Sequence, residues 1–148
     1  MLNANSDFNV PLEKITIGMQ VSYTQKVTDA DIQAFAEISG DRNPVHLDQD
    51  YAENSRYKKR IAHGLLTASY FSSLFGTKIP GEGCVYVSQS LQFKRPVFIG
   101  DTVTASVEVT SINIDKRRVF FKTTCKVKNK VVTKGVAELL VPSKEFKR

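Results

Sequence analysis

The segment Gly64–Phe75 carries apolar residues around nearly its whole circumference when it is drawn as a helix that ends at Gly76. A helix that is apolar all round is buried inside a fold rather than laid on its surface. Downstream of Gly83, apolar residues recur with a period of two, which is typical of strands. The chain is therefore expected to place one central helix against a sheet that follows it in sequence.

Four strand-like runs follow the central helix, and short turns join them. The expected strands cover residues 85–93, 103–109, 119–127 and 131–141, with tight turns at 115–117 and 129–130. Pro96 and Gly100-Asp101 separate the first run from the second. Sequential strands with such short connections form an antiparallel meander.

Residues ahead of the central helix supply one strand and shorter helices. Met19–Val27 alternates like a strand, and a second short helix is expected around Asp48–Asn54. Between them, Thr28 begins a helix, with Asp31 placed to complete a capping box. Gly40 ends that helix. The order of elements predicts an α+β fold in which an antiparallel sheet curls around a helix.

Composition indicates one soluble globular domain. The chain has 148 residues, and its 41% apolar and 24% charged residues exclude disordered and low-complexity classes. No apolar run approaches the ~20 residues that span a bilayer, and the amino-terminal segment lacks the pattern of a secretory leader. Cys84 and Cys125 lack zinc-site spacing and lie in apolar runs, so reduced buried thiols are expected, with a disulfide as the less favoured alternative. A cytoplasmic protein with no membrane partner is predicted.

Positive charge is concentrated near the carboxyl terminus. Residues 115–148 carry 11 lysine and arginine residues against 3 acidic ones. Most of these lysines alternate with apolar residues, which favours a solvated sheet face; a phosphate-bearing small molecule and a nucleic acid are the alternatives. Nucleic-acid-binding sheets interleave exposed aromatic residues with basic ones. Phe120 is the main such residue here, so no nucleic-acid partner is expected.

The polar segment Asp41-Arg42-Asn43-Pro44-Val45-His46 is the first candidate site. Pro44 disfavours a helical conformation at Asn43, so residues 41–43 are expected to be extended or turned. A carboxylate and an imidazole five residues apart on one such loop can face a single bound water, as base-assisted addition of water requires. Aspartate and asparagine also form turns without any function, and the loop alone leaves both interpretations open.

Three segments in this order between Met19 and Leu140 have counterparts in a known family. They are ISGDRNPVHLD at 38–48, IAHGLL at 61–66, and FKRPV at 93–97 with Gly100-Asp101. Together they resemble the MaoC-like dehydratase family of (R)-specific enoyl-CoA hydratases, in its short single-domain form related to hydratases that supply polyhydroxyalkanoate synthesis. The resemblance implies a hot-dog fold, an antiparallel sheet wrapped around a long central helix, formed by one domain over residues 1–148 with its core at about 19–141.

The resemblance implies a hydro-lyase that adds water to trans-2-enoyl-CoA to give (R)-3-hydroxyacyl-CoA, reversibly. Asp41 would take a proton from the water, and His46 would hold the same water and take part in protonating the α-carbon. The backbone N–H of Gly64, at the start of the central helix, would stabilise negative charge on the thioester oxygen. A glycine that lets the helix approach the sheet closely is the alternative for Gly64, and the two roles are compatible.

Further residues are secondary candidates. Asn43 is a substrate-binding candidate through a contact with Asp41 or the ligand, although shaping the turn explains it equally. Ser72 is placed beside the active site by the resemblance, although serines inside helices usually bond their own backbone. His63 is expected to orient the loop. Basic residues that could meet the phosphates of coenzyme A are Lys58, Lys59, Arg60, Lys94 and Arg95.

No metal or organic cofactor is expected, because the thioester itself acidifies the α-carbon and coenzyme A is part of the substrate. Dehydration of 3-hydroxyacyl chains on acyl carrier protein and a non-catalytic acyl-CoA-binding module remain as alternatives. A hot-dog thioesterase fits less well, because it attacks the carbonyl rather than the β-carbon. The family forms dimers with composite sites, and one sheet leaves its edges open, so a homodimer is expected.

Overall fold

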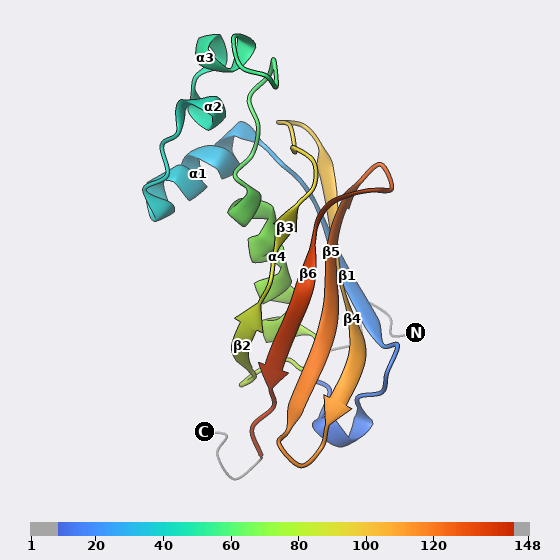
Figure 1. The fold of residues 1–148 in the computed structure, drawn as a ribbon. Coiled ribbons are helices and arrows are strands. Elements are labelled where there is room, and N and C mark those ends of the chain that lie inside the picture. Colours follow the sequence, from blue (N-terminus) through green and yellow to red (C-terminus); the bar gives the residue numbers. More distant parts are fainter. Residues whose placement is uncertain (1–8, 144–148) are drawn as a thin grey trace.

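A computed structural model describes residues 9–143, where a six-stranded antiparallel sheet lies against helix α4 (Figure 1). The strands are β1 (Gln20–Lys26), β2 (Val85–Gln89), β3 (Gln92–Phe93), β4 (Thr102–Asn113), β5 (Arg118–Val127) and β6 (Lys130–Leu140). The helices are η1 (Leu12–Lys14), α1 (Asp29–Ser39), α2 (Pro44–Leu47), α3 (Gln49–Glu53) and α4 (Gly64–Thr77). The first eight residues, part of the segment considered for a secretory leader, lie outside the described range, as do the last five.

The sheet has the order β1-β4-β5-β6-β2, with β3 also paired to β6. Consecutive strands β4, β5 and β6 form the predicted antiparallel meander. The β5–β6 turn lies at Lys128 and Asn129, one residue earlier than expected, and both residues have positive φ angles of 50° and 65°. Two such residues form the hairpin turn whose twist matches that of the strands. The predicted α+β architecture is confirmed.

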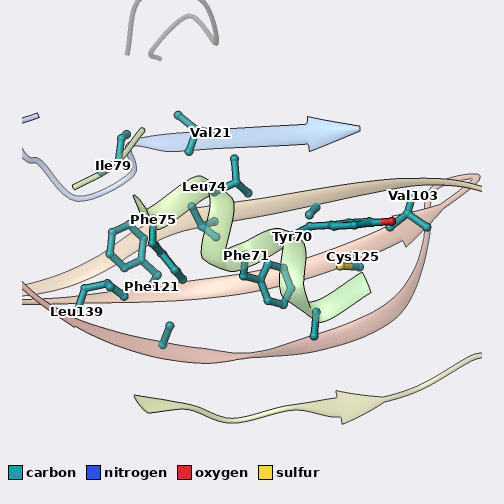
Figure 2. Close-up of a cluster of buried hydrophobic side chains, with 14 of the residues drawn as sticks. Val21, Tyr70, Phe71, Leu74, Phe75, Ile79, Val103, Phe121, Cys125 and Leu139 are labelled. Carbon is teal, nitrogen blue, oxygen red and sulfur yellow. The ribbon is translucent and has the colours of Figure 1, made fainter. Parts of the chain in front are cut away.

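The core lies between α4 and the concave face of the sheet (Figure 2). Phe71, Leu74 and Phe75 extend from α4 and are fully or almost fully buried. The rings of Phe75 and Phe121 meet edge to face, with their centroids 4.8 Å apart. Each such buried side chain contributes about 1.5–3 kcal/mol through removal of apolar area from water. This packing fixes where the amino-terminal end of α4 lies relative to the sheet.

One stripe of α4 is exposed, contrary to the expectation that the helix is buried all round. Leu65 is 58% exposed, and Ser69, Ser72 and Gly76 follow it on the same face and are also exposed. The sheet covers only part of the circumference of α4, which leaves this stripe open. The helix also continues through Gly76 to Thr77, because Gly76 does not adopt the left-handed conformation that would end it.

The expected strand over residues 85–93 is broken into β2 and β3, which is a second difference from the prediction. Ser90 leaves the strand, and its carbonyl approaches β6 so closely that a Cβ on Gly135 would lie 1.8 Å from it. Glycine at position 135 therefore permits the bend, because no other residue leaves room for that carbonyl.

The segment before α4 follows the predicted signals. Thr28 and Asp31 form a complete capping box at the start of α1, and Gly40 ends α1 in a left-handed conformation at φ 80°. Cys84 and Cys125 do not form a disulfide with each other, and Cys125 is buried in the core. Within the described residues, no helix is long and apolar enough to cross a membrane.

Candidate active site

Helices α1 and α2 lie beyond the amino-terminal end of α4 (Figure 1). A pocket of about 420 Å³ opens at this end of α4. Its lining includes Asp41, His46, His63 and Gly64. Aromatic side chains of Phe35, Tyr57 and Phe93 also line it, together with the cationic residues Arg56, Lys94 and Arg95. Three of the residues predicted from the sequence as catalytic thus share one pocket.

Asp41 is placed by the turn that follows α1. Its N–H donates to the hydroxyl of Ser39 at 3.1 Å, and its carboxylate Oδ1 accepts the N–H of Asn43 at 3.1 Å. The side chain is exposed, and no further hydrogen bond to its carboxylate occurs among the described residues. One carboxylate oxygen is therefore open to a ligand in the pocket.

His46 lies on the one-turn helix α2, which corrects the expectation that it belongs to an irregular loop. Pro44 occupies the first turn of α2, and the side chain of Asn43 caps the helix by accepting the N–H of Val45 at 3.3 Å. Proline fits here because the first N–H groups of a helix have no intrahelical partner. The side chain of Asn43 is thereby used in shaping the backbone, and Asn43 is not part of the pocket lining.

His46 is 8% exposed, and its ring is held in one tautomer. Nδ1 lies 2.8 Å from the carbonyl of Ile61, and because a carbonyl only accepts, Nδ1 carries the hydrogen. Nε2 then has a free lone pair. Burial lowers the pKa of His46, and the neighbouring His63 lowers it further, against opposing effects of the Ile61 carbonyl and Asp41. His46 is thus a neutral acceptor at physiological pH.

His63 lines the same pocket as Asp41 and His46 and is only 2% exposed. Its Nε2 donates to the backbone carbonyl of Asp41 at 3.0 Å, the contact expected of a residue that orients the loop. Its ring stacks on His46, with centroids 3.9 Å apart. One side-chain nitrogen or oxygen atom from each of Asp41, His46 and His63 lies within 4.8 Å of the other two, so the three side chains meet at one place in the pocket.

Arg60 was expected from the sequence as a candidate for binding the phosphates of coenzyme A, but its guanidinium instead makes contacts within the protein. Its Nε donates to the carbonyl of His46 at 2.7 Å, and its Nη2 pairs with Asp29 at the start of α1 at 2.5 Å. The Arg60 guanidinium lowers the pKa of Asp29. Arg60 therefore joins α1 to α2 behind the pocket.

The other basic candidates divide into two groups. Lys94 and Arg95 line the pocket, as does Arg56, which the sequence did not single out. Lys59 instead lies over the ring of Phe98 at 4.8 Å, and Lys58 is not among the lining residues. Arg56 follows α3 in an ordinary polar stretch, so only the fold reveals that it reaches the pocket.

Gly64 begins α4, and its backbone is accessible from the pocket. His63 precedes it at the helix cap and makes no side-chain hydrogen bond to the first turn. The N–H of Leu66 donates to the carbonyl of His63 at 3.1 Å, whereas the N–H of Gly64 is left for a ligand. A Cβ on Gly64 would lie 2.6 Å from Cδ1 of Phe93. Glycine thus also allows close packing, and both interpretations drawn from the sequence fit.

Ser72 lies away from this pocket within the chain. It lines a separate, mostly apolar groove with Leu65, Tyr86 and Val87. Leu65 contributes to both the groove and the pocket. The sequence-predicted candidates therefore divide into Asp41, His46 and Gly64, which meet, and Asn43 and Ser72, which do not join them within one chain.

Comparisons with known proteins agree with this geometry. Residues 13–136 match the family model of the MaoC like domain. The chain is 48% identical to the (R)-specific enoyl-CoA hydratase of Rhodospirillum rubrum over 89% of this chain and 92% of that protein. It is 43% identical to the 3-hydroxybutyryl-CoA dehydratase of Methylorubrum extorquens over 90% of this chain and 85% of that protein.

Solved structures give the same result. The (R)-hydratase of Aeromonas caviae involved in PHA biosynthesis superimposes with a TM-score of 0.86 at 38% identity, covering 88% of this chain and 99% of that one. The pocket residues at 41, 46 and 64 lie in the segments whose resemblance suggested the family. The chain belongs to the MaoC-like family and has its hot-dog fold.

Proposed function

We propose that this chain catalyses the reversible, (R)-specific hydration of trans-2-enoyl-CoA to (R)-3-hydroxyacyl-CoA. The proposal rests on one observation: Asp41, His46 and the amino-terminal end of α4 at Gly64 line the same pocket. The names of the relatives at 48% and 43% identity support this reaction in its two directions.

Asp41 and His46 hold the attacking water. The water donates one hydrogen to the open carboxylate oxygen of Asp41 and the other to the free Nε2 of His46. As the water oxygen bonds to the β-carbon, Asp41 takes its proton. The buried, neutral His46 suits this step, because an imidazolium would offer a donor where the water needs an acceptor.

Gly64 stabilises the charge that the addition creates. Attack at the β-carbon shifts electrons onto the thioester oxygen and forms an enolate. An N–H group in the first turn of α4, with the helix dipole behind it, stabilises that oxygen without reorganising. A proton then passes from the Asp41–His46 pair to the α-carbon on the same face, which restores the pair and completes the net addition of water.

The cationic residues of the pocket suit the rest of the substrate. Arg56, Lys94 and Arg95 offer guanidinium and ammonium donors to the phosphates of coenzyme A. Because the thioester acidifies its own α-carbon, the proposed reaction needs no metal and no organic cofactor. The substrate brings coenzyme A with it.

A homodimer completes the proposal. The exposed stripe of α4 and the edge strand β2 together form the apolar groove that contains Leu65, Tyr86 and Val87. An open strand edge beside apolar surface favours pairing with another chain. A second copy seated there would cover Ser72 and bring partner residues close to Leu65, at the boundary of the pocket.

Hydration of crotonyl-CoA tests the reaction. Loss of the enoyl-thioester absorbance measures turnover, and a dehydrogenase specific for the (R)-3-hydroxyacyl product reports its configuration. Wild type is expected to give the (R) product, and Asp41→Asn is expected to lose about 10²–10⁴-fold in rate, the usual contribution of a catalytic base. Asp41 is exposed, so the variant is expected to fold.

Asp50→Asn is the matched control, because Asp50 is an exposed carboxylate on α3 outside the pocket. It is expected to retain wild-type turnover. No turnover by wild type on crotonyl-CoA, with turnover of the same acyl group on acyl carrier protein, would transfer the reaction to that carrier. Equal turnover by wild type and Asp41→Asn would show that the catalytic base lies elsewhere.

A further inference from the structure

Two backbone N–H groups at the start of α4 have no hydrogen-bond partner among the described residues. The N–H of Leu66 donates to the carbonyl of His63 at 3.1 Å, so the hydrogen bonds of the helix begin there. Over residues 9–143, the N–H groups of Gly64 and Leu65 make no hydrogen bond to another residue. Helical N–H groups point toward the amino-terminal end of the helix, and both residues line the pocket at that end.

A single oxygen of the substrate can accept both of these donors. A carbonyl oxygen has two lone pairs, and the enolate oxygen of the proposed reaction carries the developing negative charge. Successive N–H groups in the first turn of a helix bind one anionic group because they lie side by side and point the same way. The N–H of Gly64 supplies one donor, and the N–H of Leu65 is available as the other.

The side chain of Thr67 bonds the same peptide group that carries the N–H of Leu65. The hydroxyl of Thr67 donates to the carbonyl of Gly64 at 3.1 Å, and one planar peptide bond joins that carbonyl to the N–H of Leu65. The same carbonyl also accepts the N–H four residues further along α4, as in any α-helix. A hydrogen bond to the C=O of a peptide group polarises it and strengthens its N–H as a donor.

Thr67 is fixed in this position by the core. Its side chain is fully buried, and it lines the pocket. Its own carbonyl accepts the thiol of Cys125 on β5, with 3.6 Å between sulfur and oxygen. Burial raises the pKa of Cys125 to about 12, so the thiol keeps its hydrogen. Thr67 therefore joins the first turn of α4 to the sheet.

We propose that the backbone N–H of Leu65 is a second donor to the thioester oxygen, beside that of Gly64, and that Thr67 is a positioning residue for it. The inference rests on the proposed hydration, because that reaction places charge on the thioester oxygen. A helical threonine commonly bonds the carbonyl three residues back. At Thr67 the bonded peptide group ends in an unpartnered N–H at the pocket, over the part of the chain that the structure describes.

Proline at position 65 tests the donor directly, because proline has no backbone N–H and fits the first turn of a helix. Leu65→Ala is the matched comparison, because it removes the side chain and keeps the N–H. We expect kcat/KM for crotonyl-CoA to be about 10²–10³-fold lower for Leu65→Pro than for Leu65→Ala, the usual cost of one oxyanion donor. Equal rates for the two variants, both folded by circular dichroism, would overturn the inference.

A second pair of variants tests Thr67. Thr67→Val removes the hydroxyl with little change of shape, and Thr67→Ser retains a hydroxyl. In Thr67→Val, kcat is expected to fall by about 2–10-fold with KM unchanged, which is the contribution of one neutral hydrogen bond. In Thr67→Ser, kcat is expected to recover. A loss shared by both variants, or a change in KM alone, would show that Thr67 serves packing only.

The absorption of a bound dienoyl thioester reports the donors without turnover. In Asp41→Asn, hexadienoyl-CoA is held unreacted, and hydrogen bonds to its carbonyl draw electrons along the conjugated chain and move its absorption band to longer wavelength. Adding Leu65→Pro is expected to reduce that shift relative to adding Leu65→Ala, and adding Thr67→Val to reduce it relative to Thr67→Ser. Unchanged shifts would overturn the inference.

The spectra and the rates separate this inference from the proposed function. If Leu65→Pro fails to fold, the shifts and rates of the Thr67 pair decide the question. A protein that shifts the band through these residues but hydrates no crotonyl-CoA would refute the proposed function and leave the two donors standing. Hydration at equal rates by Leu65→Pro and Leu65→Ala would do the opposite.

Discussion

His46 and His63 lie face to face, with ring centroids 3.9 Å apart and ring planes inclined by 28°. Through their hydrogen bonds, the pair joins the Asp41 turn, helix α2 and the segment that leads into α4. The stack also shields one face of the His46 ring from solvent. The neighbouring His63 ring lowers the pKa of His46, in addition to the larger effect of burial. The arrangement therefore favours a neutral imidazole beside the open carboxylate of Asp41.

The acid limb of the pH profile should report this environment. Because burial lowers the pKa of His46 below 6.5, kcat/KM for crotonyl-CoA is expected to hold at pH 6.5 and to fall only below it. The same lowered pKa makes the free energy of unfolding depend on pH, because His46 binds a proton more readily in the unfolded chain than in the folded one. The contribution of His46 to the free energy of unfolding is therefore complete above pH 6.5 and is lost as the pH falls through the lowered pKa. Rates and urea midpoints measured between pH 4.5 and 8.5 check both effects. If kcat/KM fell to half its maximum at a pH above 6.5, the result would contradict the conclusion that burial lowers the pKa of His46.

Arg60 should matter for stability more than its ion pair alone suggests. Arg60→Gln leaves the carbonyl of His46 without its donor, and an unsatisfied buried acceptor costs about 1–3 kcal/mol. Asp29→Asn breaks only the ion pair, whose carboxylate is 56% exposed, so it should cost no more than about 1 kcal/mol. Urea denaturation of the two variants separates these contributions. Equal losses would mean that the contact with His46 contributes little.

The fold could be predicted because its signals are local. The capping box at Thr28, the left-handed Gly40 and the alternating strands each depend on a few neighbouring residues. Asp41 and His46 could be predicted as a pair because a short segment joins them. Both residues line one pocket, and their roles as catalytic residues stay predictions.

What the sequence did not reveal depends on contacts between distant segments. Arg60 had the pattern of an exposed basic cluster, and only the packing of α1 against α2 turns it inward. The break between β2 and β3 depends on Gly135, which lies on another strand. The exposed stripe of α4 was missed because apolar periodicity does not show which part of a helix the sheet covers.

Gly64 has two proposed roles, and a pair of variants separates them. Gly64→Ala places a methyl group against the ring of Phe93, which is itself half exposed and free to move. If crowding alone explains the loss of activity, adding Phe93→Ala should restore the rate. If the methyl group blocks the approach of the thioester oxygen to the start of α4, the double variant should stay as slow as Gly64→Ala. We expect the second result, a loss of about 10²-fold or more that persists, as for removal of one oxyanion donor. Steady-state kinetics of the four proteins of the cycle measures it.

Val87 should decide the oligomeric state. It lies at the irregular step of the edge strand β2, is 42% exposed and lines the groove beside α4. Light scattering of wild type is expected to give twice the chain mass of 16.5 kDa. Val87→Lys places a charge at the proposed interface, where an unpaired buried charge is costly, and should shift the protein toward monomers. Ile38→Lys is the matched control, because Ile38 is 86% exposed on α1 and does not line the groove. A dimer that survives Val87→Lys would place the interface elsewhere, and a monomeric wild type would contradict the proposed dimer. If activity falls together with the dimer, the result would support an active site that the second copy completes.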